Sequence, residues 1–245
     1  MHTCESVGGG GSIGRVTDGS DPGIRFAVGA GYACYRGPAI DVSLHRHAAF
    51  QVAIAVRGAV TVVDAAGASH RGTALLVPPM AAHRMRAGPE LRTFFVEPHC
   101  AFADRLRDRC GPGVTVADEL HGLGEEDVRF ARPSRVLDPR LVAAMDAVTA
   151  PGRSIPAVAA QVGLSPQRLR PLARAQLGMP LSRWRVWGRL GRTAEALREG
   201  RSLADAALEG GFADQAHMTR WMREMMGLTP RAALAALRPQ ARRAT

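Results

Sequence analysis

Three histidines and a glutamine in the first half of the chain have side chains that can bind a ligand. His45 and His47 are two residues apart in a strand-like segment, so both side chains lie on one face of a strand. Gln51 follows in the same segment, and His83 comes further along the chain. Imidazole nitrogens bind Zn, Fe, Ni and Mn, so three of them on one interior face could hold a metal ion.

The spacing of these residues resembles two sequence motifs of the cupin family. The residues that carry the resemblance are His45, His47 and Gly58 in the first motif, with Gln51 at the position of its acidic ligand, and Gly72, Pro78 and His83 in the second. The resemblance implies a small β-barrel whose interior brings His83 beside the other two histidines. Three positions depart from the motifs: Gln51 replaces the acidic ligand, Met80 replaces the usual glycine, and the final asparagine is missing.

The missing carboxylate lowers the expected affinity for divalent ions and removes the obvious general base. We therefore expect His45, His47, Gln51 and His83 to line the pocket of a small-molecule effector. A metal site of the Zn type ranks second and a catalytic metal third. Simple packing of the barrel, with partly exposed imidazoles, explains these residues about as well as an effector pocket does. No cofactor is predicted with certainty.

The cysteines offer a weaker candidate site. Cys4, Cys34, Cys100 and Cys110 form no CxxC pair, so we expect reduced thiols. His99 and Cys100 together with Cys110 could form a soft-metal or redox sensor. A cysteine is more often a small buried apolar residue, which is the interpretation we favour.

Most of the net positive charge is in the C-terminal part of the chain. The formal net charge is +10, and all 32 basic residues are arginines. Residues 1–136 hold 15 arginines and 14 acidic residues, whereas residues 137–245 hold 17 and 8. A near-neutral part joined to a strongly basic part indicates a sensing or catalytic domain attached to a domain that binds a polyanion. A generally arginine-rich proteome is the competing explanation.

The basic part contains an internal repeat with an offset of 48 residues, in which residues 154–164 align with residues 202–212. Each copy predicts a capped short helix, a glycine-containing turn, a second helix and a glycine stop, which is the helix-turn-helix pattern. Gly163 and Gly211 lie where the turn favours a positive φ, and Ala159 and Ala207 allow the two helices to approach closely. Two such units within the basic part favour DNA binding over ordinary helical hairpins.

The repeat resembles the DNA-binding domain of the AraC/XylS family of bacterial transcription regulators, over residues 154–235. The matching residues around the second unit are Arg189, Leu190, Ala194, Leu197, Ser202, Leu203, Ala207, Gly211, Phe212, Gln215, Met218, Thr219, Arg220, Gly227, Leu228, Thr229 and Pro230. The resemblance implies two helix-turn-helix units joined by a long helix, here Leu181 to Arg198. It also implies that the second helix of each unit enters the major groove of DNA.

The candidate DNA-contacting residues lie on these two recognition helices. They are Gln167, Arg168, Arg170 and Arg174 in unit one and Gln215, Ala216, His217, Arg220 and Arg223 in unit two. Glutamine can hydrogen-bond adenine, and arginine can bind guanine or a phosphate. Pro171 occupies the place where relatives usually carry a polar or basic groove residue, so we expect unit two to dominate specificity.

The surrounding sequence predicts an α+β protein of two domains: an N-terminal cupin-like β-barrel, linker helices and a C-terminal all-α domain. Short β-segments are expected near residues 51–56, 59–63, 74–77 and 91–96, and amphipathic helices over 101–109 and 138–150. The predicted boundaries are a flexible tail at 1–23, a sensor domain at 24–98, linker or dimerisation helices at 99–150, a DNA-binding domain at 151–238 with helix-turn-helix units at 154–178 and 202–227, and a basic tail at 239–245.

We interpret the chain as a cytoplasmic, sequence-specific transcription regulator whose cupin domain senses a small effector, and not as an enzyme. A metal-dependent cupin enzyme fused to a helical DNA-binding module is the alternative, and a non-specific DNA-associated protein is a third. The expected partners are double-stranded promoter DNA, a small-molecule effector and, for an activator, RNA polymerase. No apolar run is long enough to span a membrane. A homodimer stays open, because two units in one chain can already bind adjacent major grooves.

Overall fold

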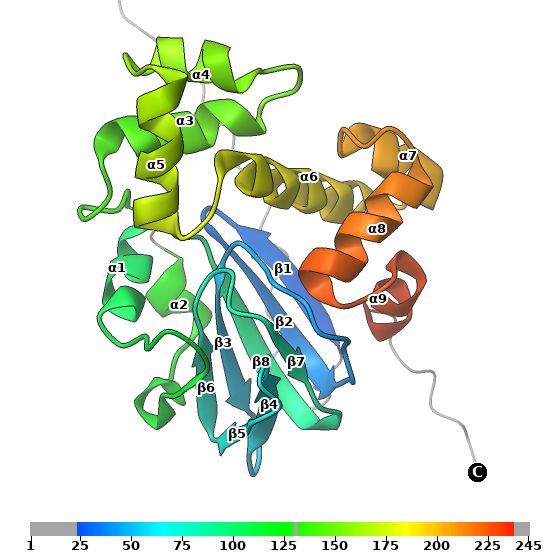
Figure 1. The fold of residues 1–245 in the computed structure, drawn as a ribbon. Coiled ribbons are helices and arrows are strands. Elements are labelled where there is room, and N and C mark those ends of the chain that lie inside the picture. Colours follow the sequence, from blue (N-terminus) through cyan, green and yellow to red (C-terminus); the bar gives the residue numbers. More distant parts are fainter. Residues whose placement is uncertain (1–23, 130–131, 238–245) are drawn as a thin grey trace, which may run out of the picture.

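The computed structural model describes residues 24–129 and 132–237 (Figure 1). A β-rich N-terminal domain is followed by a helical C-terminal domain, which confirms the predicted α+β organisation. The tails predicted at 1–23 and 239–245 lie outside the described residues, as does Cys4.

The N-terminal domain consists of two antiparallel sheets. The larger contains β1 (Arg25–Gly29), β2 (Tyr32–Ala39), β8 (Gly88–Val96), β3 (Phe50–Ala55), β6 (Ala74–Val77) and β9 (Thr115–Val116), in that spatial order. The smaller contains β5 (Ser69–Gly72), β4 (Val60–Asp64) and β7 (His83–Met85). The four β-segments expected from the sequence correspond to β3, β4, β6 and β8. Every residue of β3 and β6 is buried, which explains why all residues of these two strands except Gln51 are apolar.

Short helices extend this domain on one side of the larger sheet. They are α1 (Ala101–Arg107), a 3₁₀ turn at Asp118–Leu120 and α2 (Glu125–Val128). Leu106 of α1 packs in the same apolar cluster as Phe94 of β8. The helix predicted over 101–109 therefore ends two residues early and belongs to the core of the barrel domain.

The C-terminal domain is helical throughout its described part. It contains α3 (Pro139–Thr149), α4 (Ile155–Gln161), α5 (Pro166–Leu177), α6 (Leu181–Arg198), α7 (Leu203–Glu209), α8 (Gln215–Met226) and α9 (Pro230–Leu237). The turns of the two units are built as the repeat predicts, because Gly163 and Gly211 have φ values of 69° and 85°. Ser154 and Ser202 cap α4 and α7 by accepting backbone N–H groups.

One apolar core joins both helix-turn-helix units to α3. Met145 of α3, Leu169 of α5 and Met218 of α8 lie in the same buried cluster. Trp184 of α6 is also part of it and donates its indole N–H to the carbonyl of Met145 at 3.0 Å. The segment 99–150 is thus shared between two cores: α1 packs with the barrel and α3 packs with the helix-turn-helix units. The domain boundaries given above remain predictions.

The two domains are in direct contact. The long helix α6 lies across one end of the barrel, and the C-terminal end of α8 lies beside it (Figure 1). Ala48, from the loop before β3, is buried in the core of the helical domain. Trp187 of α6 donates its indole N–H to the Glu97 carboxylate at 3.1 Å, just after β8. This end of the barrel is the one that carries the histidines.

Candidate nucleic-acid interface and histidine cluster

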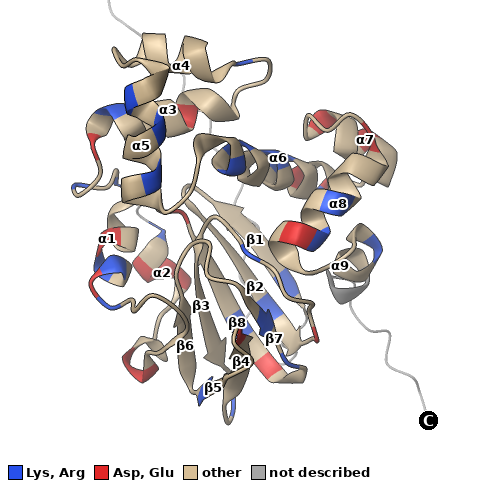
Figure 2. Cartoon of the chain, viewed as in Figure 1, with Lys and Arg blue, Asp and Glu red and all other residues tan. Residues whose placement is uncertain are grey.

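The predicted contact residues of unit one form an exposed basic face on α5. Gln167, Arg168, Arg170 and Arg174 lie on one helix that continues through Pro171, and the arginines among them are exposed. Leu169 and Ala173, on the opposite face, are buried in the domain core. Figure 2 shows the basic residues spaced along α5. The helix therefore presents guanidinium groups to solvent, as the DNA-binding interpretation requires.

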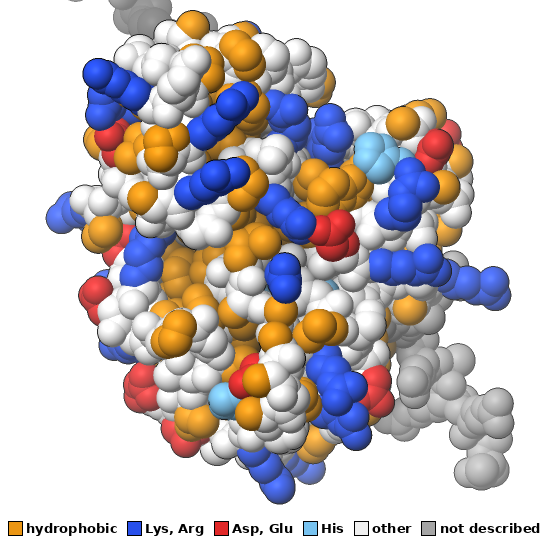
Figure 3. Space-filling view, viewed as in Figure 1, with side chains coloured by type: hydrophobic (Ala, Val, Ile, Leu, Met, Phe, Trp, Pro, Cys, Tyr) orange, Lys and Arg blue, Asp and Glu red, His pale blue; other side chains and the backbone are white. Residues whose placement is uncertain are grey.

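Unit two has the same arrangement on α8. Gln215, Ala216, Arg220 and Arg223 are exposed, whereas Met218, Met222 and Met225, on the opposite face, are buried. Asp214 caps the helix, and its carboxylate accepts the backbone N–H of His217 at 2.6 Å. On the face shown in Figure 3, basic side chains gather over α5 and again over α8.

His217 differs from the other predicted contact residues because its ring is held within the domain. The indole N–H of Trp221 donates to Nε2 of His217 at 3.0 Å. The Phe212 ring packs edge-on against it, with ring centroids 5.5 Å apart. The side chain is half-buried, and these contacts hold its ring at the start of the recognition helix.

Two arginines of α6 bind backbone carbonyls of neighbouring segments, and Arg192 thereby ties the second unit to α3. Sequence reasoning did not single them out. Arg192 donates to the carbonyls of Thr149, at the end of α3, and Gly210, in the turn of unit two, at 2.8 and 3.0 Å. Arg185 donates to the carbonyl of Val148 at 3.3 Å. Burial, followed by repulsion from Arg189, lowers the pKa of both guanidinium groups. The sequence gives little indication of this role, because an arginine that binds a carbonyl cannot be distinguished by sequence from an exposed arginine on the same long helix.

The structure brings the predicted histidines together. His45 and His83 form an antiparallel bridge, with backbone N–H···O distances of 3.0 and 3.1 Å. One ring nitrogen from each of His45, His47 and His83 lies within 4.8 Å of the others. The residues are 6%, 0% and 0% exposed, so the expectation of partly exposed imidazoles was wrong.

The three rings share one arrangement of hydrogen bonds, and their burial favours the neutral form. Nδ1 of His45, His47 and His83 lies 2.9, 2.8 and 3.0 Å from the carbonyls of Ser43, Ala49 and Ala81 respectively. A ring whose Nδ1–H donates to a carbonyl keeps its lone pair on Nε2. Burial, followed by the neighbouring ring of His47, lowers the pKa of His45 to about 4 and that of His83 to about 2. Burial also lowers the pKa of His47.

Gln51 completes a set of four electron-pair donors. Its amide oxygen lies 3.0 Å from Nε2 of His47 and 2.8 Å from Nε2 of His83. With neutral rings these lone pairs repel one another. A cation among them relieves the repulsion, and so does a rotated amide whose NH₂ group donates to both rings. Three imidazoles oriented by backbone carbonyls suit a metal ion that prefers nitrogen ligands, such as Zn²⁺. Bound there, the ion would supply a positive charge that attracts the lone pairs of the three rings.

A surface cavity lies next to this cluster. Its volume is about 550 Å³, and its lining is Asp41, Val42, Ser43, Leu44, Val63, Asp64, Ala65, Gly67, Arg84 and Arg86. Ser43 belongs both to this lining and to the hydrogen bonds of the cluster, but none of the three histidines lines the cavity. The buried rings therefore do not open into this cavity, and only something as small as an ion would fit among them.

Among the described residues, the cysteines join no group of three or more side chains that could hold a metal ion. The described residues include three free cysteines, of which Cys34 and Cys100 are buried. Burial raises the pKa of Cys34 and Cys110 to about 12 and also raises that of Cys100. These groups are thiols at neutral pH, in line with the preference for simple apolar packing.

Comparison with known protein families assigns the helical domain. Residues 158–236 match the model of a family described as a helix-turn-helix domain. This range contains the second unit, most of the first and the helix between them. Residues 158–236 are a helix-turn-helix domain of the AraC type.

The AraC-type domain and the barrel together have the fold of ToxT from Vibrio cholerae. The apo form of a ToxT variant superposes with a TM-score of 0.58 at 11% identity, covering 85% of this chain and 98% of that one. ToxT with bound unsaturated fatty acid gives a TM-score of 0.54 at 10% identity, covering 90% and 98%. A transcriptional regulator with an AraC-type domain from Chromobacterium violaceum is 26% identical over 42% of this chain and 96% of its own, with a TM-score of 0.39.

The comparison with curated proteins found no match. Among the described residues, no helix has the length and apolar character needed to cross a membrane. The chain thus combines a domain of two antiparallel sheets with an AraC-type helix-turn-helix domain, in the arrangement that ToxT also has.

Proposed function

We propose that the chain is a sequence-specific regulator of transcription that binds promoter DNA through α5 and α8 and senses a small effector in its barrel domain. The observation that supports it most is the pair of exposed basic faces on the two recognition helices. Within the part of the chain that the structure describes, Arg168, Arg170, Arg174, Arg220 and Arg223 take part in no ion pair. Their charges are available to phosphates and base edges.

The proposal includes a cytoplasmic location, and contact with RNA polymerase if the protein activates transcription. It does not require a dimer. The apolar faces of α1 and α3, which were candidates for a dimer interface, pack inside this chain. A dimer would therefore have to form through other surfaces.

The proposal predicts unequal effects of two arginine substitutions. Arg220→Ala should weaken binding to the protein's own promoter by about 10- to 100-fold, since one bidentate base contact contributes about 1–3 kcal/mol. Arg170→Ala should have a smaller effect, because Pro171 beside it takes the place of a groove residue. The measurement is a mobility-shift titration with footprinting at fixed salt.

Arg57→Ala is the matched control, because it removes one exposed arginine from the barrel domain. The Arg57→Ala protein should bind promoter DNA with the same affinity as the wild type. Equal binding of the wild type to promoter and random fragments would contradict the proposed function. A larger loss for Arg170→Ala than for Arg220→Ala would contradict the dominance of unit two.

A metal-dependent cupin enzyme is the second candidate, and the histidine cluster is the observation in its favour. Gln51 stands where a carboxylate would be needed, and the three buried rings do not line the cavity beside them. Regulation of transcription therefore explains more of the structure than catalysis does.

A further inference from the structure

Each recognition helix is attached to the barrel domain at its C-terminal end, but the two attachments differ. At the end of α8, the backbone N–H and the hydroxyl of Ser43 donate to the carbonyl of Gly227 at 3.2 and 2.9 Å. The N–H of Arg46 donates to the carbonyl of Glu224 at 3.1 Å. Segment 43–47, which contains two of the clustered histidines, is thus bonded directly to the second recognition helix.

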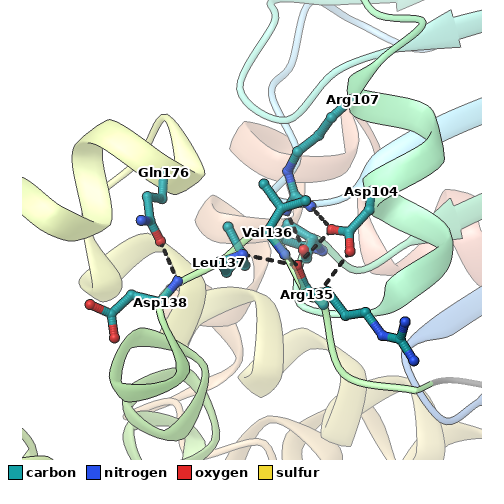
Figure 4. Close-up of polar contacts among 9 residues, drawn as sticks. Asp104, Arg107, Arg135, Val136, Leu137, Asp138 and Gln176 are labelled. Atoms are coloured by element: carbon teal, nitrogen blue, oxygen red, sulfur yellow. Dashed lines mark hydrogen bonds and ion pairs between the residues drawn. The ribbon is translucent and has the colours of Figure 1, made fainter.

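The attachment of α5 runs through a different segment, residues 134–138 (Figure 4). The N–H of Asp138 donates to the side-chain oxygen of Gln176 on α5 at 2.8 Å. On the other side, the Asp104 carboxylate of α1 accepts the Ser134 hydroxyl at 2.6 Å and the Arg135 N–H at 2.9 Å. This attachment involves none of the histidines of the cluster.

The two attachments also differ in the space around the glycine that ends each recognition helix. Gly178 and Gly227 both have left-handed backbones, with φ values of 70° and 68°. A Cβ atom on Gly178 would meet no atom of the described residues within 4 Å. A Cβ atom on Gly227 would lie 2.5 Å from the carbonyl oxygen of Ser43 and 2.9 Å from Nδ1 of His45. The end of α8 therefore packs closely against Ser43 and His45, whereas no described residue packs against the same position at the end of α5.

Ser43 links the two sites through its own atoms. Its carbonyl accepts Nδ1–H of His45 at 2.9 Å, while its N–H and hydroxyl hold Gly227. The donor nitrogens of the three rings are spread over up to 4.8 Å. Nitrogens that share a tetrahedral Zn²⁺ lie only about 3.4 Å apart, so binding would draw the rings together. A shift of the His45 ring displaces the carbonyl that it binds, and with it the contact to α8.

We propose that a divalent transition-metal ion bound by His45, His47 and His83 is sensed at the second recognition helix through segment 43–47. The first recognition helix keeps its separate attachment and stays in place. This inference rests on the proposed function, for which it names the class of effector and the route of its signal. DNA affinity is then controlled at unit two, the unit expected to carry most of the specificity.

The test compares the full chain treated with a chelator and the same chain with one equivalent of Zn²⁺. Hydrogen exchange is followed in peptides spanning residues 222–230 and residues 173–181, which are the matching ends of α8 and α5. Zn²⁺ should change exchange in the first peptide and leave the second unchanged, and it should change promoter affinity by about fivefold or more. His83→Gln should abolish stoichiometric Zn²⁺ binding by calorimetry, and His121→Gln, at an exposed position, should not.

Paired glycine variants test the route itself. Gly178→Ala and Gly227→Ala introduce the same backbone strain, but only the second clashes with Ser43 and His45. Gly178→Ala protein should respond to Zn²⁺ like the wild type, whereas Gly227→Ala protein should bind Zn²⁺ without the response at 222–230. If Gly227→Ala protein does not fold, Ser43→Ala, which removes one hydrogen bond to Gly227, should reduce the same response.

The inference is overturned if Zn²⁺ does not bind at one equivalent, if both peptides respond equally, or if the variants at Gly227 and Ser43 keep the full response. Failure of the proposed function gives a different result, namely a folded protein that does not distinguish promoter from random DNA with or without Zn²⁺. Specific promoter binding whose affinity does not change with Zn²⁺ refutes the inference and leaves the proposed function intact.

Discussion

Each ring of the histidine cluster donates its Nδ1–H to a carbonyl two residues away along the chain. This local geometry follows from extended backbone, and the alternation of His45 and His47 was enough to predict that they share a face. The position of Gln51 between two rings could not be predicted in the same way. It depends on the pairing of segments that are 32 residues apart in sequence.

The buried rings should make the fold sensitive to mild acid. In the folded state the pKa of His45 is about 4 and that of His83 about 2, whereas in an unfolded chain both rings take up protons near their ordinary pKa of 6.5. Below that value the unfolded state binds more protons, so the free energy of unfolding falls as pH falls. Each ring contributes a slope of up to about 1.4 kcal/mol per pH unit.

Urea denaturation of the chelator-treated protein between pH 7 and pH 5 measures this slope. His83→Gln should flatten it, because a glutamine does not titrate, and His121→Gln should leave it unchanged. A slope that is the same in the wild type and in His83→Gln would show that His83 does not titrate as its burial implies.

At the level of elements, the helices were predictable where the sequence carries its own start and stop signals. Ser154 and Ser202 begin their helices as caps, and Gly178 and Gly227 end theirs in left-handed conformation. The partner of each element was not predictable. The apolar face of α3 was recognised, but nothing local shows that it packs on the helix-turn-helix units and not on another chain.

Pro171 should weaken α5, since it removes the N–H that would bond to the carbonyl of residue 167. Pro171→Ala is expected to stabilise the C-terminal domain by roughly 1–3 kcal/mol. Thermal unfolding of the full chain is the measurement. Pro166→Ala is the control, because a proline in the first position of a helix has no such bond to lose, and its effect should be near zero.

At the level of the whole molecule, the uneven distribution of arginines was the sequence feature that indicated the DNA-binding part of the chain. Such a feature can be read from sequence because side chains that bind a polyanion have to lie on the surface. The contact between the domains gave no such signal. Ser43 and Gly227 are 184 residues apart, and most of the hydrogen bonds at this contact use backbone atoms that any sequence provides. The two attachments of the recognition helices could therefore be found only in the structure.

The shared core predicts where the chain can be divided. Leu141, Ala144, Met145 and Val148 of α3 are all 0% exposed. Loss of one large buried side chain costs about 2–5 kcal/mol, and a whole domain is stable by only about 5–15 kcal/mol. A fragment of residues 134–245 should unfold cooperatively in urea, and a fragment of residues 151–245 should have no cooperative transition. A cooperative transition in the shorter fragment would contradict the assignment of α3 to this core.

The exposed basic groups of α5 and α8 are all guanidinium groups, and the sequence contains no lysine. Lysine charge can be switched off by acetylation, whereas guanidinium groups stay protonated at any physiological pH. Lysine acetylation therefore cannot remove the positive charge that the recognition helices present to DNA. Control over DNA binding can instead change where these charges lie, and the C-terminal ends of both recognition helices are attached to the barrel domain.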